Sequence, residues 1–534
     1  MGKISQFVKA GALLLSMAGC SSPNSGGKDA EMDRFISDLM GRMTLQEKLG
    51  QLNLPAGNDL VSGAVKNSKM AEAIRAGEVG GFFNVKGVDK IYQMQRMAVE
   101  ETRLGIPLIV GADVIHGYET IFPIPLALSC SWDTAAVTRM ARISATEASA
   151  DGISWTFSPM VDICRDARWG RIAEGSGEDP YLGALMAGAY VRGYQGDGMK
   201  QNNEIMACVK HFALYGASES GRDYNSVDMS RNLMYNVCLA PYKGAVEPRP
   251  LTRGDDRQLR AEALRVAASA DVIVAALGES AEMSGESSSR TDIQIPDAQK
   301  DLLKALVATG KPVVLALFTG RPLDLCWESE HVPAILNVWF AGSEAGDAIA
   351  DVMFGDVSPS GKLTTSFPRA VGQLPLYYNH LNTGRPDTDD TTFNRYGSNY
   401  IDQSNEPLYP FGYGLSYTTF RYGNLQLSAE RMAKGGQLKV TVPVTNSGEC
   451  DGIEIVQLYL HDVYAEISRP VKELKAFRRV ALKKGETQNV EFVLDEDDLK
   501  YYNSRLEYGY EPGEFEVMVG PDSRNVQHAT FVAE

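Results

Sequence analysis

Hydrophobic residues are spaced in two different ways along the chain. Up to about residue 366, continuous apolar runs alternate with stretches of helical periodicity. In the first part we expect strands at 80–84, 107–112, 154–160 and 205–211, and a further strand at 51–54. Because strands separated by helices form parallel sheets, this part predicts a β/α barrel.

Local signals predict where individual helices begin and end. Thr44 and Glu47 have the capping-box pattern, in which each side chain bonds the backbone N–H of the other residue. A helix between Asp133 and Ala150 begins with an Asp cap and stops at Asp151-Gly152. Helices are therefore expected between the strands.

The barrel pattern is incomplete. A whole eight-stranded barrel takes on the order of 250 residues, and the alternation here stops after roughly five strands. The last residues that fit it lie near 246–250. The sequence therefore predicts a partial barrel.

The next part predicts an α/β sandwich. Continuous apolar runs at 271–277, 312–318 and 334–340 are typical of strands buried on both faces of a parallel sheet. An amphipathic helix is expected at 296–309, and Ser343 is the expected cap of a second helix that ends at Gly355.

From residue 421 onward, hydrophobic residues occupy every second position. This spacing recurs at 438–444, 456–460, 490–494 and 515–519, with glycine-containing turns between the runs. It predicts a β-sandwich. Residues 367–420 show little periodicity and much Pro, Gly, Asn and Tyr, so they predict an ordered connector.

Composition excludes some classes of function. With 534 residues and 44% hydrophobic content, the chain can bury several cores. Its formal net charge of -16 argues against nucleic acid as a partner, because binding phosphates requires a basic surface. Apart from Cys20, the cysteines lack CxxC spacing and the histidines form no paired motif, so no metal site is predicted.

The first residues have the pattern of an export signal. Lys3 precedes an apolar run at 11–17, and Ala18-Gly19-Cys20 follows where a signal peptide ends. This resembles a bacterial lipoprotein signal, in which the mature chain begins at Cys20 and its thiol carries the lipid. Met17 stands where such signals more often carry Leu, so a plain secretory signal is the alternative. Both alternatives predict export, to the periplasm or, as a lipoprotein, to the outer membrane.

Ionisable residues follow three of the expected strands. Asp113 and His116 follow one strand, carboxylates and arginines alternate with glycines at 162–180, and Lys210 and His211 end another strand. Because the carboxyl ends of parallel strands meet at one edge, these residues predict one pocket. The alternative is a set of solvated loops joined by ion pairs.

Several longer motifs contain these residues. They are Gly-Ala-Asp-Val-Ile-His-Gly at 111–117, Arg-Trp-Gly-Arg at 168–171, Ser-Gly-Glu-Asp-Pro at 176–180, Val-Lys-His-Phe at 209–212, Ser-Gly-Glu-Ser-Ser-Ser-Arg at 284–290 and Tyr-Pro-Phe-Gly-Tyr-Gly-Leu-Ser-Tyr at 409–417. Together they resemble glycoside hydrolase family 3 β-glucosidases of the periplasmic bacterial type. The resemblance implies a multidomain α/β fold with a TIM-type barrel, an α/β sandwich with a parallel sheet, and a C-terminal fibronectin type III-like β-sandwich.

The resemblance also implies a retaining glycosidase that needs no cofactor. Asp113, Arg171, Lys210 and His211 match the residues that hold the sugar hydroxyls in the cleavage subsite, a task that suits carboxylate acceptors and charged donors. Glu286 matches the acid/base, which protonates the leaving oxygen and then activates water. Alternatives to Glu286, or partners that tune it, are Glu279, Glu282 and Arg290. Residues expected to hold Arg168 and Arg171 in place are Glu174, Glu178 and Asp179.

The nucleophile that the resemblance implies is not found. In the family it lies in a Ser-Asp-Trp or Thr-Asp-Tyr type motif, which this sequence lacks. The end of the barrel, the nucleophile, and the first strand and helix of the second domain are therefore expected to be deleted near residues 247–260. Asp223, Asp228 and Asp255-Asp256 are the nearest carboxylates, but none follows a strand.

We therefore expect a signal peptide at 1–20, a truncated barrel at 31–247, an α/β sandwich at 259–366, a connector at 367–420 and a fibronectin type III-like domain at 421–534. The expected function is hydrolysis of terminal β-D-glucosyl residues from oligosaccharides or glycosides with retention. The alternatives are a sugar-binding protein without catalysis and a chain that does not fold as a unit. Expected partners are a β-glucoside and, through Cys20, a membrane, and a homodimer is left open.

Overall fold

The computed structural model describes residues 26–56, 68–245, 271–386 and 394–534. The chain forms two compact units, residues 1–110 and 111–534. The expected export signal and the junction at 247–260 lie outside the described residues. Within the described residues, no helix is long and apolar enough to cross a membrane.

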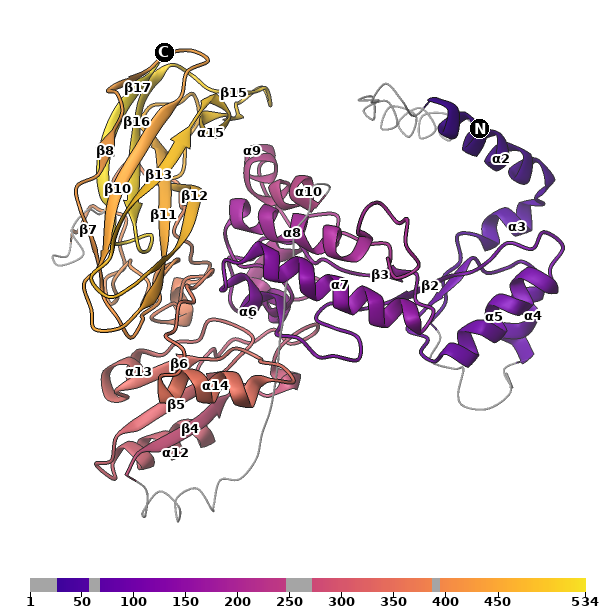
Figure 1. Cartoon of the computed structure of the whole chain (residues 1–534), viewed down its shortest axis with the longest axis horizontal. Coiled ribbons are helices and arrows are strands. Elements are labelled where there is room, and N and C mark those ends of the chain that lie inside the picture. Colours follow the sequence, from indigo (N-terminus) through magenta and orange to yellow (C-terminus); the bar gives the residue numbers. More distant parts are fainter. Residues whose placement is uncertain (1–25, 57–67, 246–270, 387–393) are drawn as a thin grey trace. The chain divides into compact units, whose positions relative to one another are not determined.

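The first unit contains four helices and a short strand among its described residues. These are α2 (Gly26–Arg42), α3 (Leu45–Gly50), α4 (Ser68–Arg75), β1 (Gly81–Phe83) and α5 (Val88–Glu100) (Figure 1). The Thr44 and Glu47 capping box is confirmed at the start of α3: the Glu47 amide donates to the Thr44 hydroxyl at 3.2 Å, and the Thr44 amide donates to the Glu47 carboxylate at 2.7 Å. The strand expected at 51–54 is wrong, because Ala56 alone forms a parallel bridge with Phe83.

Short parallel strands form the barrel-like part of the chain. β2 (Ile109–Ala112) begins at the end of the first unit, and in the second unit it pairs in parallel with β3 (Trp155–Thr156). Single parallel bridges then join Trp155 to Met206 and Met160 to Lys210. The strand expected at 205–211 is therefore present only as isolated bridges among the described residues, and one of these bridges places Lys210 beside Met160.

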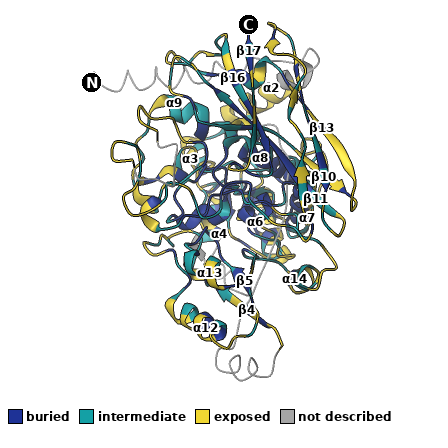
Figure 2. Cartoon of the chain, turned by 90° about the vertical axis from the view of Figure 1, so that its left-hand side faces the viewer, coloured by how far each residue is buried: buried dark blue, intermediate teal, exposed yellow. Residues whose placement is uncertain are grey.

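Helices of the second unit cover these strands. They are α6 (Pro125–Ser129), α7 (Thr134–Ala150), α8 (Pro180–Gln195), α9 (Arg231–Leu233) and α10 (Ala240–Ala245). The predicted cap of α7 is confirmed, because the Asp133 carboxylate accepts the amides of Ala135 and Ala136 at 3.0 and 2.9 Å. α8 packs against both α7 and α10 and is buried over most of its length, as its dark blue ribbon shows (Figure 2).

The α/β sandwich follows the predicted order. Its elements are β4 (Ile273–Gly278), α12 (Asp297–Val307), β5 (Val313–Phe318), α13 (Cys326–His331), β6 (Ala334–Asn337) and α14 (Ala345–Phe354). The three strands are parallel in the order β4-β5-β6. The cap position of α14 is Glu344 and not Ser343, and Gly355 ends the helix in the left-handed conformation as expected.

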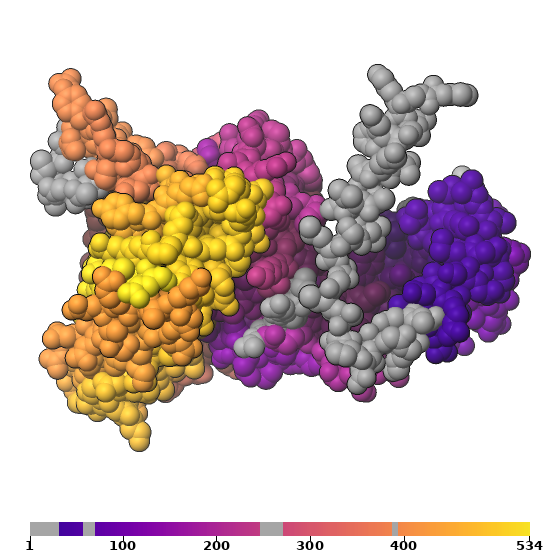
Figure 3. All heavy atoms as spheres, turned by 90° about the horizontal axis from the view of Figure 1, so that it is seen from above, coloured from indigo at the N-terminus to yellow at the C-terminus, as the bar shows by residue number. Residues whose placement is uncertain are grey.

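The alternating pattern after residue 421 forms two packed sheets. The elements of this region are β7 (Phe420–Tyr422), β8 (Gln426–Leu427), β9 (Arg431–Met432), β10 (Leu438–Asn446), β11 (Gly452–Asp462), β12 (Glu473–Leu482), β13 (Thr487–Leu494), α15 (Glu496–Leu499), β14 (Tyr501–Tyr502), β15 (Tyr508–Gly509), β16 (Gly513–Gly520) and β17 (Gln527–Ala533). Of these, β14 and β15 form a separate two-stranded sheet. One sheet has the order β12-β11-β16-β17-β9, and the other contains β13-β10-β7. Every second residue of β10 is buried in the shared core. In the space-filling view the orange and yellow C-terminal residues form one continuous body (Figure 3).

Aromatic side chains join this sandwich to the earlier part of the second unit. Trp132 is 2% exposed, and its ring packs edge-on against Phe477 of β12 with 5.0 Å between centroids. Tyr378 of the connector stacks on Phe411 and lies edge-on to Tyr459 of β11. The sandwich therefore packs against the residue just before α7 and against the connector.

Candidate active site

Two of the predicted sugar-binding residues form an ion pair. Asp113 directly follows β2, and Lys210 lies at the parallel bridge with Met160. The Lys210 Nζ is 3.0 Å from the Asp113 Oδ1, and the Asp113 side chain is 42% exposed while that of Lys210 is 14% exposed. The pair presents a carboxylate acceptor and an ammonium donor at the edge of the sheet, as sugar hydroxyls require.

His211 is held by a buried carboxylate that the sequence did not single out. Asp162 Oδ2 accepts the His211 amide at 3.0 Å and lies 2.9 Å from the His211 Nδ1, while Oδ1 accepts the Tyr215 amide at 3.1 Å. Asp162 has a fully buried side chain. Because a carboxylate only accepts here, Nδ1 carries a proton and Nε2 is the ring nitrogen left for a ligand.

Arg171 links the barrel part to the predicted acid/base. Its guanidinium makes two hydrogen bonds of 2.9 Å to Glu174, which confirms Glu174 as its support. The same guanidinium lies 3.2 Å from the Glu286 carboxylate. Burial acts to lower the pKa of Arg171, but the paired carboxylates outweigh it and the pKa is raised. Arg171 is thus a fixed cation aimed at Glu286.

Tyr215 connects the two groups. The His211 ring lies edge-on to the Tyr215 ring with 5.0 Å between centroids. The Arg171 guanidinium lies 5.7 Å from the centroid of the same Tyr215 ring. The structure therefore brings together Arg171, His211 and Glu286 through Tyr215, and the peptide bond between Lys210 and His211 joins the pair of Asp113 and Lys210 to them.

Glu286 itself is half-exposed in the loop after β4. Its side chain is 53% exposed, and the Tyr224 hydroxyl donates to its carboxylate at 2.6 Å. A carboxylic acid in such a position can meet solvent and a substrate oxygen, which general acid catalysis requires.

Two domain families match long stretches of the sequence. A model of the glycosyl hydrolase family 3 C-terminal domain matches residues 60–417, and a fibronectin type III-like domain model matches residues 454–523. The chain belongs to glycosyl hydrolase family 3. It is 34% identical to a periplasmic beta-glucosidase of Salmonella typhimurium, over 93% of this chain and 95% of the relative. It is 27% identical to a beta-xylosidase of Formosa agariphila, over 82% of this chain and 92% of that relative.

Solved structures of family 3 enzymes share the fold. A beta-glucosidase from Listeria innocua, determined in complex with glucose among other ligands, is 32% identical, with a TM-score of 0.86 and coverage of 94% of this chain and 99% of that chain. The alignment with the Salmonella relative spans 734 positions, although this family 3 chain has 534 residues. At least 200 aligned positions therefore have no residue in this chain.

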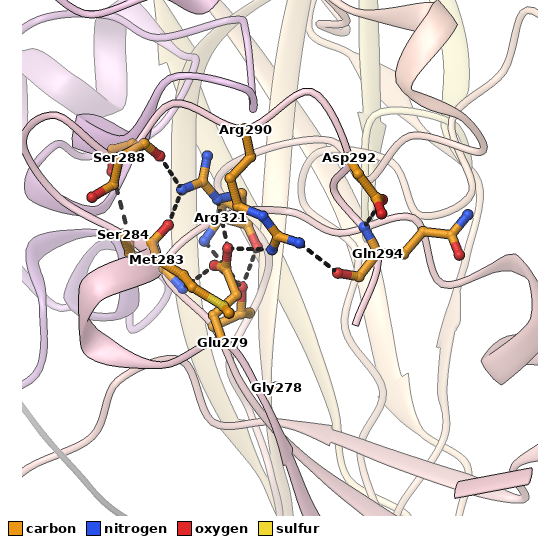
Figure 4. Close-up of polar contacts among 12 residues, drawn as sticks. Gly278, Glu279, Met283, Ser284, Ser288, Arg290, Asp292, Gln294 and Arg321 are labelled. Atoms are coloured by element: carbon orange, nitrogen blue, oxygen red, sulfur yellow. Dashed lines mark hydrogen bonds and ion pairs between the residues drawn. The ribbon is translucent and has the colours of Figure 1, made fainter. Parts of the chain in front are cut away.

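Burial distinguishes one of the alternatives, Glu279, from Glu286 in this family 3 chain, whereas Glu282 is exposed as Glu286 is. Glu279 is completely buried as a side chain and bonds Arg290 at 2.7 Å and Arg321 at 2.8 Å. Its carboxylate therefore serves an internal ion-pair cluster and lies out of reach of a substrate. Arg321, which the sequence analysis missed, is fully buried at the centre of this cluster (Figure 4).

Two expected supports act elsewhere. Glu178 accepts the amides of Ser366 and Tyr378 at 2.7 and 3.1 Å, and Asp179 accepts the Tyr378 hydroxyl at 2.6 Å. The arginines have other partners, because Arg168 pairs with Asp166 at 2.6 Å and Arg171 pairs with Glu174 at 2.9 Å. The expected role of Glu178 and Asp179 as supports of the arginines is wrong, since they bind the connector to the start of α8.

Asp223, considered above as a replacement nucleophile, lies at the centre of the site. Its Oδ1 accepts the indole N–H of Trp169 at 2.9 Å and the Tyr215 hydroxyl, and its Oδ2 accepts the amide of Ser287 at 2.6 Å. Burial acts to raise the pKa of Asp223, but these hydrogen bonds outweigh it and the pKa is lowered. Asp223 is therefore an ionised carboxylate with both oxygens occupied. No local motif indicates this role, because Trp169 and Ser287 lie 54 and 64 positions away from Asp223.

Proposed function

We propose that this protein hydrolyses terminal non-reducing β-D-glucosyl residues of oligosaccharides or glycosides with retention. The observation that carries the proposal is the arrangement in which the Asp113 and Lys210 pair directly precedes His211 in the chain and His211 contacts Arg171 through Tyr215. These residues can hold the hydroxyls of one sugar ring while Glu286, on the far side of Arg171, faces the leaving oxygen. The relatives named as beta-glucosidases support glucose as that sugar.

The acid/base step follows from the position of Glu286. Its carboxylic acid donates a proton to the leaving glycosidic oxygen as the C1–O bond breaks and the nucleophilic carboxylate that retention requires forms a bond to C1; the leaving group takes the electron pair of the broken bond. The resulting Glu286 carboxylate then takes a proton from the water that attacks C1, and the nucleophilic carboxylate leaves with the electron pair of its bond to C1 as glucose is released. Arg171 and Tyr224 hold the carboxyl group during both steps.

Retention also needs a nucleophilic carboxylate, and the described residues supply none in the expected context. The absence of the family motif and the 734 aligned positions against 534 residues support a deletion that includes it. The same observations favour a second candidate function, in which the chain binds a glucosyl residue without cleaving it.

One experiment separates these functions. Purified protein is incubated with 2,4-dinitrophenyl β-glucoside with and without azide, beside a Glu286→Gln variant, and the anomer of any glucosyl azide is determined by NMR. Azide that attacks the substrate directly gives the α-azide by a single inversion, whereas azide that intercepts a covalent glycosyl-enzyme gives the β-azide. Turnover without azide, together with β-azide from Glu286→Gln, supports retention by an internal nucleophile.

The other outcomes have equally definite meanings. Turnover that occurs only with azide present, with the α-azide as the only glucosyl azide formed, indicates a site that lacks its nucleophile. No turnover under any condition, with glucose binding detected by calorimetry, supports the sugar-binding function. No turnover and no binding contradicts both functions.

Export is a separate part of the proposal. The signal pattern at 1–20 and the similarity to a relative named periplasmic support export, with Cys20 as the lipid-carrying residue. Expression in a Gram-negative host with labelled palmitate tests this directly. A labelled, membrane-bound protein that becomes unlabelled in Cys20→Ala supports lipidation, and an unlabelled periplasmic protein supports the plain secretory signal.

A further inference from the structure

The loop that carries Glu286 is tied to the barrel part at two points. The amide of Gly285 donates to the carbonyl of Gly170 at 2.9 Å, and the amide of Arg290 donates to the carbonyl of Arg168 at 2.9 Å. A Cβ at position 170 would lie 2.3 Å from the carbonyl oxygen of Gly285, so only glycine permits this approach. The two bonds lie on either side of Glu286 in the sequence.

A buried arginine also holds the same loop, through its backbone carbonyls. Arg321 is fully buried, and its guanidinium donates to the carbonyls of Met283 and Ser288, the latter at 2.8 Å. The Glu279 carboxylate holds that guanidinium in place at 2.8 Å. Figure 4 shows the guanidinium of Arg321 between the Glu279 carboxylate and the backbone of the loop. The base of the loop is therefore fixed on both sides of Glu286.

The tip of the loop, Glu286 and Ser287, takes no part in these backbone contacts and is held through side chains: Glu286 contacts Arg171 and Tyr224, and the Ser287 hydroxyl donates to the Tyr224 hydroxyl at 3.2 Å. Ser287 has a φ of 59°, in the left-handed region, which costs a residue with a side chain about 1 kcal/mol. In this conformation its amide reaches the Asp223 Oδ2 at 2.6 Å. The contact offsets the cost of the backbone conformation, because a hydrogen bond to a charged acceptor is among the stronger ones in proteins.

Asp223 is itself anchored to residues beside the sugar-binding group. Its Oδ1 accepts from Tyr215, which touches both His211 and Arg171, and from Trp169, which is fully buried. The carboxylate therefore has one oxygen on the barrel part and the other on the tip of the acid/base loop.

We propose that Asp223 is a positioning residue for Glu286, which sets the distance between the acid/base carboxyl and the sugar-binding residues by holding the amide of Ser287. The inference rests on the proposed role of Glu286. It explains why a carboxylate with both oxygens occupied lies at the centre of the site: Asp223 acts through Ser287 and does not touch the substrate.

The Asp223→Asn variant tests the contact selectively. An asparagine that keeps its carbonyl oxygen on Trp169 and Tyr215 must turn its amide group toward the Ser287 N–H, so two donors face each other and the bond is lost. Asp228→Asn is the matched control, because Asp228 is an exposed carboxylate in the same segment. In hydrogen exchange measured by mass spectrometry, we expect the segment 284–290 to exchange about tenfold faster in Asp223→Asn and unchanged in Asp228→Asn.

A kinetic comparison tests the effect on acid catalysis. Values of kcat/KM are measured with azide present for 2,4-dinitrophenyl β-glucoside, whose leaving group needs no proton, and for phenyl β-glucoside, whose leaving group does. We expect the dinitrophenyl-to-phenyl ratio to rise about tenfold or more in Asp223→Asn, in the direction of Glu286→Gln. The ratio does not depend on the fraction of protein that is folded, so a general loss of structure leaves it unchanged.

Failure of the proposed function and failure of this inference give different results. A wild-type chain inert toward both substrates contradicts the proposed function, and the exchange measurement then decides whether Asp223 holds the loop. Unchanged exchange at 284–290 in Asp223→Asn overturns the inference, whatever the activity. Faster exchange with an unchanged ratio in an active protein overturns it as well, because the loop would then move without consequence for Glu286.

Discussion

Loss of Arg321 should destabilise the part of the protein that supports the acid/base loop. Arg321→Met removes a fully buried guanidinium that bonds Glu279 and the carbonyls of Ala167, Arg168, Met283 and Ser288. It leaves the buried Glu279 carboxylate with Arg290, the Thr319 hydroxyl and the Gly320 amide.

The expected loss in the free energy of unfolding follows from these contacts. Removing one partner of a buried ion pair costs about 3–5 kcal/mol, because the remaining charge keeps its desolvation penalty. Since Arg290 still pairs with Glu279, we expect a value near the lower end, about 3 kcal/mol. The double variant Glu279→Leu with Arg321→Met should cost less than the sum of the single variants by about 1–3 kcal/mol, because it removes both charges together.

Urea unfolding followed by tryptophan fluorescence is a suitable assay. All five tryptophans, Trp132, Trp155, Trp169, Trp327 and Trp339, precede the C-terminal sandwich, and of these Trp132 packs against Phe477 of that domain. Trp169 and Trp339 lie in the hydrophobic cluster beside Arg321. A cost below about 1 kcal/mol for Arg321→Met, or additive costs in the double variant, would refute the view that the pair is a single buried unit.

Three further predictions concern other contacts. Burial raises the pKa of Glu178 from 4.5 to about 7. The stability that this residue contributes is therefore fully present below about pH 4.5 and is lost as the pH rises through 7, by up to about 3 kcal/mol. The urea midpoint should fall between about pH 5 and pH 8 in the wild type and fall less in Glu178→Gln; equal slopes in the two proteins would contradict this. Lys210→Met should weaken glucose binding, measured by calorimetry, about tenfold or more, because the ammonium group that donates to sugar hydroxyls and pairs with Asp113 is lost. An unchanged affinity would show that Lys210 does not bind the sugar. Tyr224→Phe removes the hydroxyl that donates to Glu286, so kcat/KM for phenyl β-glucoside should fall about threefold to tenfold while the exposed control Tyr464→Phe has no effect; equal effects of the two changes would contradict a specific contact.

Much of the architecture follows from local pattern alone. The caps at Thr44 and Asp133 hold as predicted, because a cap joins residues within one turn of helix. The sandwich follows from alternation along β10 and its neighbours, because strand geometry places every second side chain on one face. The failures are also local in origin: the apolar pattern at 51–54 has no partner strand beyond Ala56, and Ser343 lies one residue before the cap of α14.

The sequence by itself determined which residue types the site contains and on which strand ends they lie, since Asp113 follows one predicted strand and Lys210 and His211 end another. Only the tertiary structure decided how they are held. Asp162 meets His211 across 49 positions, Asp223 meets Ser287 across 64, and Glu279 meets Arg321 across 42. No periodicity records such pairs, because a side-chain contact between distant segments depends on how the backbone packs. The acid/base loop is positioned by that packing.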